Sequence, residues 1–126
     1  MSRAIIPPGF PPNPFLSPGT LVESPSRTLY VSGQVGVGPG GKPAEGIGAQ
    51  ASAAIGNLNA VLAAAGMSTA DIVKLTIYLT DEASIPGFIE AAAGTLPSPP
   101  PATTMLIVKA LASPALLIEI EAIAAS

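Results

Sequence analysis

The last quarter of the chain consists of two short apolar runs that alternate like β-strands. Residues 101–111 and residues 116–124 are rich in Ile, Val and Leu, and Ser113-Pro114 separates them. Because the side chains of a strand alternate between two faces, Thr103 and Thr104 fall on opposite faces of the first run. Both faces are largely apolar, so we expect two neighbouring strands in a sheet that is covered on both sides.

Glu119 is an exception within the second apolar run. Its neighbours Ile118 and Ile120 fall on one face of the strand, and Glu119 falls on the other. A carboxylate among Ile and Leu loses hydration at a considerable free-energy cost unless it gains partners or a proton. Glu119 is therefore either a functional acid or a carboxylate that accepts hydrogen bonds at an interface, and both interpretations stay open.

The chain before these runs alternates between strand-like and helix-like patterns. The expected elements are a hairpin with strands at 20–23 and 28–32, a helix at 47–65, a strand at 72–80 with Val73, Leu75, Ile77 and Leu79 on one face, and a helix at 84–94. Residues 1–19 are rich in proline and should form an extended arm. The order of elements predicts one α+β domain over residues 1–126, a sandwich with two helices covering one face of a mixed sheet.

The two helices carry local start and stop signals. The first has an apolar stripe at helical spacing, and Gly66 fits a left-handed C-terminal cap. The second begins at Ser84, with Pro86 in its first turn. The face of the sheet that these helices leave open needs another cover, and a further copy of the chain is the simplest one.

Composition excludes several classes of function. The chain is 48% apolar and only 10% charged, which favours burial of part of its surface in an oligomer. A net charge of −3 argues against nucleic-acid binding, and no apolar run approaches the roughly 20 residues of a membrane span. The N-terminus is broken by prolines where a signal peptide needs an unbroken apolar core, so we expect a cytoplasmic protein. Because the chain has no Cys and no His, we expect neither a metal site nor a cofactor.

Five segments of the chain form a pattern in fixed order and spacing. They are Tyr30–Gln34, Gln50–Gly66, Asp71–Asp81, Pro101-Ala102 and Ile118–Ala124. Together they resemble the RidA (YjgF) family over nearly the whole chain. The resemblance implies a chorismate-mutase-like fold and a homotrimer around a barrel-like core, with small-metabolite clefts between subunits. It also implies hydrolysis of reactive enamines and imines as the family's best-known activity.

The resemblance also implies a set of site residues. The cleft should hold Ser32, Gly33, Gln34, Thr103, Thr104 and Glu119, contributed by two neighbouring chains, with Glu119 positioning or activating water. Active family members carry an arginine after the Pro-Ala pair, where this chain has Thr103. Leu16 stands where a tyrosine is expected, and Ile89 stands where the second helix usually has an asparagine, and the resemblance implies that both positions bind substrate as well. From residue chemistry alone, the favoured interpretation of Ser32-Gly33-Gln34 is a strand end with a turn glycine.

These departures change the expected function. A guanidinium binds a carboxylate through two charge-assisted hydrogen bonds, which the hydroxyl of Thr103 does not replace. We therefore expect a trimeric protein with a small-metabolite cleft at each subunit interface and without efficient enamine/imine deaminase activity. The alternative is an active deaminase, a hydrolase that releases ammonia and uses Glu119 to handle water. A ribonuclease activity is disfavoured by the acidic charge balance and the lack of histidine.

Overall fold

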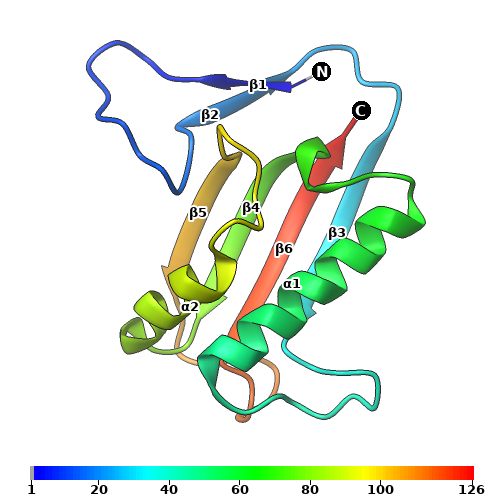
Figure 1. Ribbon diagram of the computed structural model, residues 1–126, viewed down its shortest axis with the longest axis vertical. Coiled ribbons are helices and arrows are strands. Elements are labelled where there is room, and N and C mark those ends of the chain that lie inside the picture. The colour runs from blue at the N-terminus through cyan, green and yellow to red at the C-terminus, as the bar shows by residue number, and fades with distance from the viewer. Residues whose placement is uncertain (1) are drawn as a thin grey trace.

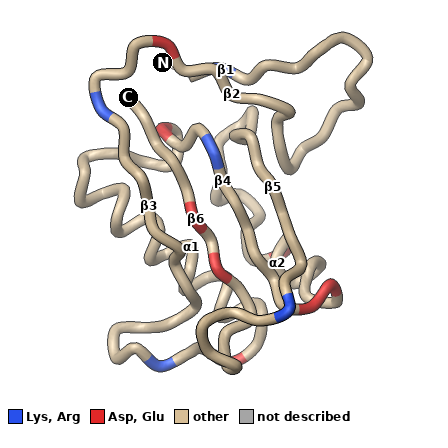
Figure 2. The backbone as a smooth tube through the Cα atoms, turned by 180° about the vertical axis from the view of Figure 1, so that it is seen from behind, with Lys and Arg blue, Asp and Glu red and all other residues tan. Residues whose placement is uncertain are grey.

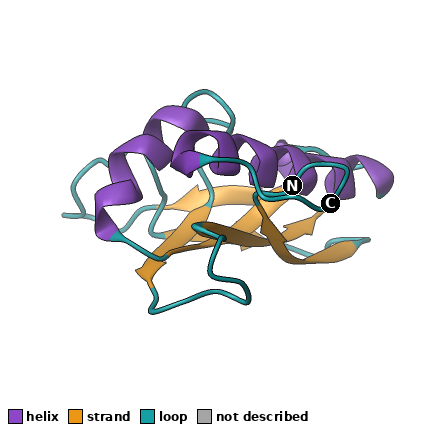
Figure 3. Cartoon of the chain, turned by 90° about the horizontal axis from the view of Figure 1, so that it is seen from below, coloured by secondary structure: helices purple, strands orange, loops and turns teal. Residues whose placement is uncertain are grey.

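The computed structural model, which describes residues 2–126, has two layers (Figure 3). The strands are β1 (Ser2–Ile5), β2 (Gly19–Val22), β3 (Thr28–Val35), β4 (Ile72–Leu79), β5 (Ala102–Ile107) and β6 (Ile118–Ala125), and the helices are α1 (Gly46–Ala64) and α2 (Ile85–Ala92). Both helices cover the same face of the main sheet (Figure 1). The predicted α+β sandwich is therefore confirmed. Neither helix in the described chain is long and apolar enough to cross a membrane.

The main sheet has the strand order β3-β6-β4-β5. Strands β4 and β5 are parallel, and β6 runs antiparallel to both β3 and β4. The prediction that the two C-terminal strands are neighbours is wrong, because β4 lies between them. A parallel pair needs a crossover connection, and α2 supplies it between β4 and β5. In this order β5 forms the edge of the sheet beside β4, and β6 lies between β3 and β4.

The predicted hairpin between residues 20–23 and 28–32 is also wrong. Strand β2 pairs with β1 in a separate two-stranded sheet, and β3 pairs with β6. The backbone N–H groups of Ser26 and Arg27 both donate to the carbonyl of Ser126, at 2.8 and 3.0 Å, and so direct the connector towards β6. The proline-rich arm, predicted to be extended, contains strand β1 at Ser2–Ile5. Met1, which the predicted arm includes, lies outside the described residues.

Helix α1 ends as its sequence predicts. Gly66 has a φ of +70°, a left-handed conformation that glycine adopts without steric cost. Its N–H donates to the carbonyl of Ala63, and the N–H of Met67 donates to that of Leu62, both at 2.9 Å. This pair of bonds is a Schellman motif, which satisfies the last carbonyls of the helix. The apolar stripe of α1, including Leu58 and Leu62, is buried against the sheet.

The core lies between the helices and the near face of the sheet. Strand β4 contributes Ile72, Leu75, Ile77 and Leu79, all of them buried. Strand alternation predicts Val73 on this face, whereas the structure has Ile72 there. A shift of register against β6 between Ile72 and Lys74 moves Val73 out of the core and Ile72 into it.

The face of the main sheet that points away from the helices is mixed, whereas the sequence predicted a largely apolar face. Cross-strand pairs share a face, so the register places on it Lys74, Thr76, Tyr78, Thr104, Leu106, Glu119, Glu121 and Ile123. Figure 2 views this face and shows acidic positions on β6 and a basic position on β4. Two pairs of polar groups meet on this face: Lys74 Nζ donates to Thr104 Oγ1 at 2.7 Å, and the hydroxyl of Tyr78 donates to Glu121.

Candidate functional site

The predicted site residues form two groups, and Thr103 of the first and Glu119 of the second lie on opposite sides of the main sheet. The first group, Leu16, Ile89 and Thr103, lines a cavity on the helix side. The second group, Ser32, Gly33, Gln34 and Glu119, lies on the paired strands β3 and β6. Thr104 belongs to the open face, where it accepts a hydrogen bond from Lys74. Within one chain the structure therefore does not bring Glu119 and Thr103 into one cleft.

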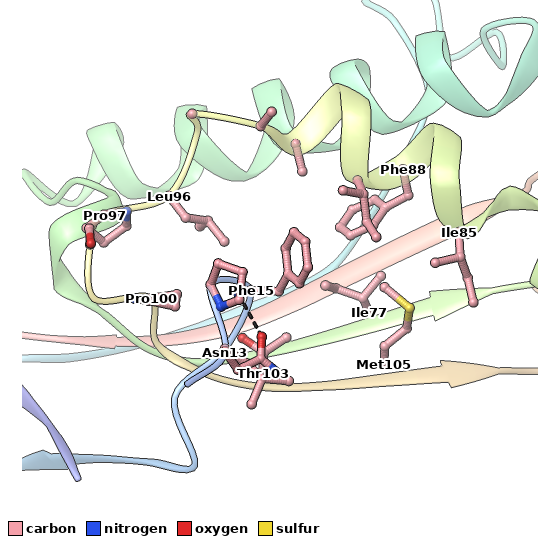
Figure 4. Close-up of a pocket in the computed structure, with 17 residues that line it drawn as sticks. Asn13, Phe15, Ile77, Ile85, Phe88, Leu96, Pro97, Pro100, Thr103 and Met105 are labelled. Carbon is pink, nitrogen blue, oxygen red and sulfur yellow. Dashed lines mark hydrogen bonds between the residues drawn. The ribbon is translucent and has the colours of Figure 1, made fainter. Parts of the chain in front are cut away.

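The cavity has a volume of about 450 Å³ and lies between α2 and the strands β4 and β5. Phe88 and Ile85 enter it from α2, and Ile77 and Met105 enter it from the sheet (Figure 4). Phe15, from the proline-rich arm, lines it on another side. Apolar and aromatic walls of this kind are typical of pockets that bind small molecules.

The proline-rich arm reaches the cavity because Ser17 anchors it. Ser17 is 3% exposed, its N–H donates to the carbonyl of Pro101 at 3.2 Å, and its hydroxyl donates to that of Pro100 at 2.5 Å. The N–H of Ala102 donates in turn to the hydroxyl of Thr20 at 2.8 Å. These bonds tie the arm to the start of β5, so Leu16 and Thr103 line the same cavity although 87 positions separate them (103 minus 16).

None of the described residues that line the cavity carries a charge. Its polar groups include Asn13, whose Oδ1 accepts the backbone N–H of Phe15 at 2.8 Å, and Thr103, whose hydroxyl donates to the carbonyl of Pro101 at 3.0 Å. Two of the basic residues are engaged elsewhere: Lys74 on the open face and Arg27 at the end of α1. The cavity wall of this chain thus offers no cation to a bound carboxylate.

Glu119 packs directly against Gly33. The β3–β6 register shifts between Val31 and Gln34, so Ser32 and Gly33 form an irregular step opposite β6. A Cβ at position 33 would overlap the carboxylate of Glu119, and glycine leaves the room that this side chain fills. Gly33 is not a turn glycine, because β3 continues through Val35.

Sequence reasoning missed the pair of Tyr78 and Glu121 on the open face. The hydroxyl of Tyr78 donates to the carboxylate of Glu121, and this bond raises the pKa of Tyr78 above its ordinary value. Partial desolvation and the negative charges of Glu121 and Glu119 act in the same direction. Alternation within each strand shows which residues share a face of that strand. Only the register between β4 and β6 shows that Tyr78 and Glu121 are neighbours.

The sequence matches one family model over most of its length and a curated relative over part of it. A family model described as Endoribonuclease L-PSP matches residues 18–126. The 2-iminobutanoate/2-iminopropanoate deaminase of Rattus norvegicus is 42% identical over 57 residues, which are 44% of this chain and 42% of that protein. The chain thus spans less than half the length of this curated relative.

Two solved structures are similar over most of their length. The YyfB protein of the conserved Rid family from Yersinia pestis, described as of unknown function, has a TM-score of 0.85 and 34% identity, covering 99% of this chain and 98% of that one. RidA from the Antarctic bacterium Psychrobacter sp. PAMC 21119 has a TM-score of 0.75 and 34% identity, covering 87% of each chain.

Proposed function

Because this chain belongs to the Endoribonuclease L-PSP family, which includes the RidA and YjgF proteins, we propose that it is a small-metabolite-binding member without efficient enamine/imine deaminase activity. One observation carries the proposal. The three positions that depart from the residues expected for the family, Leu16, Ile89 and Thr103, all line one cavity. No charged side chain lines that cavity in the described chain.

An imine derived from an amino acid carries a carboxylate that the cavity would have to hold. An ionised carboxylate that enters an apolar cavity loses its hydration and must find charged or hydrogen-bonding partners there. Loss of a buried, bidentate arginine contact costs about 2–5 kcal/mol, which is a factor of roughly thirty to several thousand in turnover efficiency. Threonine at position 103 recovers little of this, since its hydroxyl already donates to the carbonyl of Pro101.

We propose that the complete cleft forms between neighbouring copies in a homotrimer. Glu119 and the cavity lie on opposite sides of one sheet, so a second copy is needed to bring a carboxylate of this kind to the cavity. Strand β5 also exposes Leu106 and Ile107, each 47% accessible, at an edge of the sheet. Association would cover these side chains.

A second candidate function is an active imine hydrolase that uses Glu119 to handle water. The observation that favours it is the close fit of Glu119 against Gly33, which holds a half-buried carboxylate in a defined position. Substrate would then be held by backbone and hydroxyl groups alone. The first candidate function predicts slow imine hydrolysis by the wild-type chain, and the second predicts efficient hydrolysis.

The test generates an imine with an amino-acid oxidase and follows its loss in the presence of each variant. Thr103→Arg should raise imine hydrolysis at least about tenfold over wild type, because it restores the charge-assisted contact. Thr103→Gln is the matched control, since it lengthens the side chain without adding charge and should give no gain. Equal gains in both variants, or none in a folded Thr103→Arg protein, would contradict the proposal.

A further inference from the structure

We infer that the cavity takes a compact, neutral and largely apolar molecule whose polar end both donates and accepts hydrogen bonds, such as a primary carboxamide. This inference rests on the proposed function, because it names the ligand class of the same cavity. It follows from the size of the cavity, from its walls and from the hydrogen-bonding groups at its polar end.

The size and walls select a small apolar body. A volume of about 450 Å³ lies within the range of roughly 300–1,000 Å³ that is typical of small-molecule pockets. Phe88 and Ile77 are 7% and 4% exposed, so the cavity floor belongs to the packed core. Met105 adds a polarizable thioether beside them (Figure 4). These walls favour a ring or a branched aliphatic group.

The polar end selects the functional group. Asn13 uses its carbonyl oxygen to accept the N–H of Phe15, which leaves its amide NH₂ as a donor. Thr103 uses its hydroxyl proton on the carbonyl of Pro101, which leaves the lone pairs of its oxygen as acceptors. Both side chains line the cavity (Figure 4). The hydroxyl of Ser98 also lines the cavity and can donate or accept, so every hydrogen-bonding side chain that the described lining offers is neutral.

A carboxamide complements this pair of groups, whereas a carboxylate does not. The carbonyl of a carboxamide accepts from Asn13, and its NH₂ group donates to Thr103. A carboxylate has only acceptor oxygens at neutral pH, so one of them would meet the lone pairs of Thr103. It would also be desolvated without a cation to balance its charge. The two groups have nearly the same shape, so charge and hydrogen bonding alone separate them.

The experiment measures the binding of phenylacetamide and phenylacetate by titration calorimetry. Wild type should bind phenylacetamide at least about tenfold more tightly than phenylacetate. Thr103→Arg should reverse this preference, because it supplies a cation. Thr103→Val keeps the shape of the side chain but removes the acceptor, so phenylacetamide affinity should fall by roughly threefold to tenfold.

Two further variants locate the site. Ala92→Phe would fill part of the cavity and should abolish binding, whereas Ala63→Phe on the exposed side of α1 should leave it unchanged. Circular dichroism confirms that each variant is folded. Equal or tighter binding of phenylacetate by wild type, or binding of neither compound, would overturn the inference. Imine turnover by wild type would instead overturn the proposed function, so the two failures are distinguishable.

Discussion

At the scale of single residues, the site depends on which atoms are missing. Gly33 has no Cβ, and the carboxylate of Glu119 occupies the space that a Cβ would need. Position 103 has no guanidinium, and the cavity that it lines is free of charge in the described chain. The missing Cβ leaves room for the carboxylate of Glu119, and the missing guanidinium determines which molecules the cavity can bind.

Gly33→Ala should destabilise the fold by about 0.5–1.5 kcal/mol, because the new methyl group forces the flexible Glu119 side chain into another rotamer. Gly40→Ala is the matched control, since a Cβ at position 40 would meet no atom within 4 Å, and it should be close to neutral. Urea unfolding measures both. In a Glu119→Ala background the cost of Gly33→Ala should largely disappear. An unchanged cost in that background would show that the carboxylate is not the obstacle.

Glu121→Gln should lower the pKa of Tyr78, because it removes the charged acceptor that stabilises the neutral phenol. A spectrophotometric titration of phenolate measures this, and Tyr78→Phe assigns the signal. The folded chain holds the phenol proton of Tyr78 more tightly than the unfolded chain, in which the pKa of tyrosine is about 10. The stabilisation is therefore complete below about pH 10 and is lost as the pH rises through the folded pKa. An unshifted titration in Glu121→Gln would contradict the assignment.

At the scale of elements, the helices could be predicted from the sequence because their signals are local. The stripe of α1, its Gly66 cap and the proline in the first turn of α2 all lie within the helices or next to them. Strand partners could not be predicted in this way. The pairing of β3 with β6 and the backbone bonds from Ser26 and Arg27 to Ser126 join residues about 100 positions apart, which no local pattern reveals.

The site shows the same division between local and long-range information. The unusual residues at positions 16, 89 and 103 could be recognised individually from the family pattern. The family pattern assigned them to one substrate site, but the contact that brings Leu16 there could not be predicted, since it depends on the bonds from Ser17 to Pro100 and Pro101. Sequence alternation correctly separated the faces of Thr103 and Thr104, although it did not reveal that Thr104 accepts a hydrogen bond from Lys74.

Two glycine substitutions in and after α1 should have opposite effects. Gly66→Ala should destabilise the fold by about 1 kcal/mol, because alanine tolerates a φ of +70° poorly. Gly56→Ala, at an exposed position inside the helix with open space around it, should stabilise by roughly 0.5–1 kcal/mol. Thermal unfolding of both variants measures the difference. A change of the same sign in both would contradict the assignment of Gly66 to the cap.

At the scale of the whole molecule, we expect three copies of the chain to associate in dilute solution. The helices cover only one face of the main sheet, and β5 leaves Leu106 and Ile107 accessible at its edge. Sedimentation equilibrium at micromolar concentration measures the mass, which should be three times the 12.4 kDa of one chain. A stable monomer would remove the argument that Glu119 of a neighbouring copy completes the cleft.

The central claim is that a cavity without a cation cannot hold the carboxylate of an imine well enough for efficient hydrolysis. The most direct test is the rate at which the wild-type chain hydrolyses 2-iminobutanoate, compared with buffer and with a family member that carries the arginine. We predict a rate close to that of buffer and at least about thirtyfold below that of the arginine-containing relative. A wild-type rate that matches the relative would contradict the account.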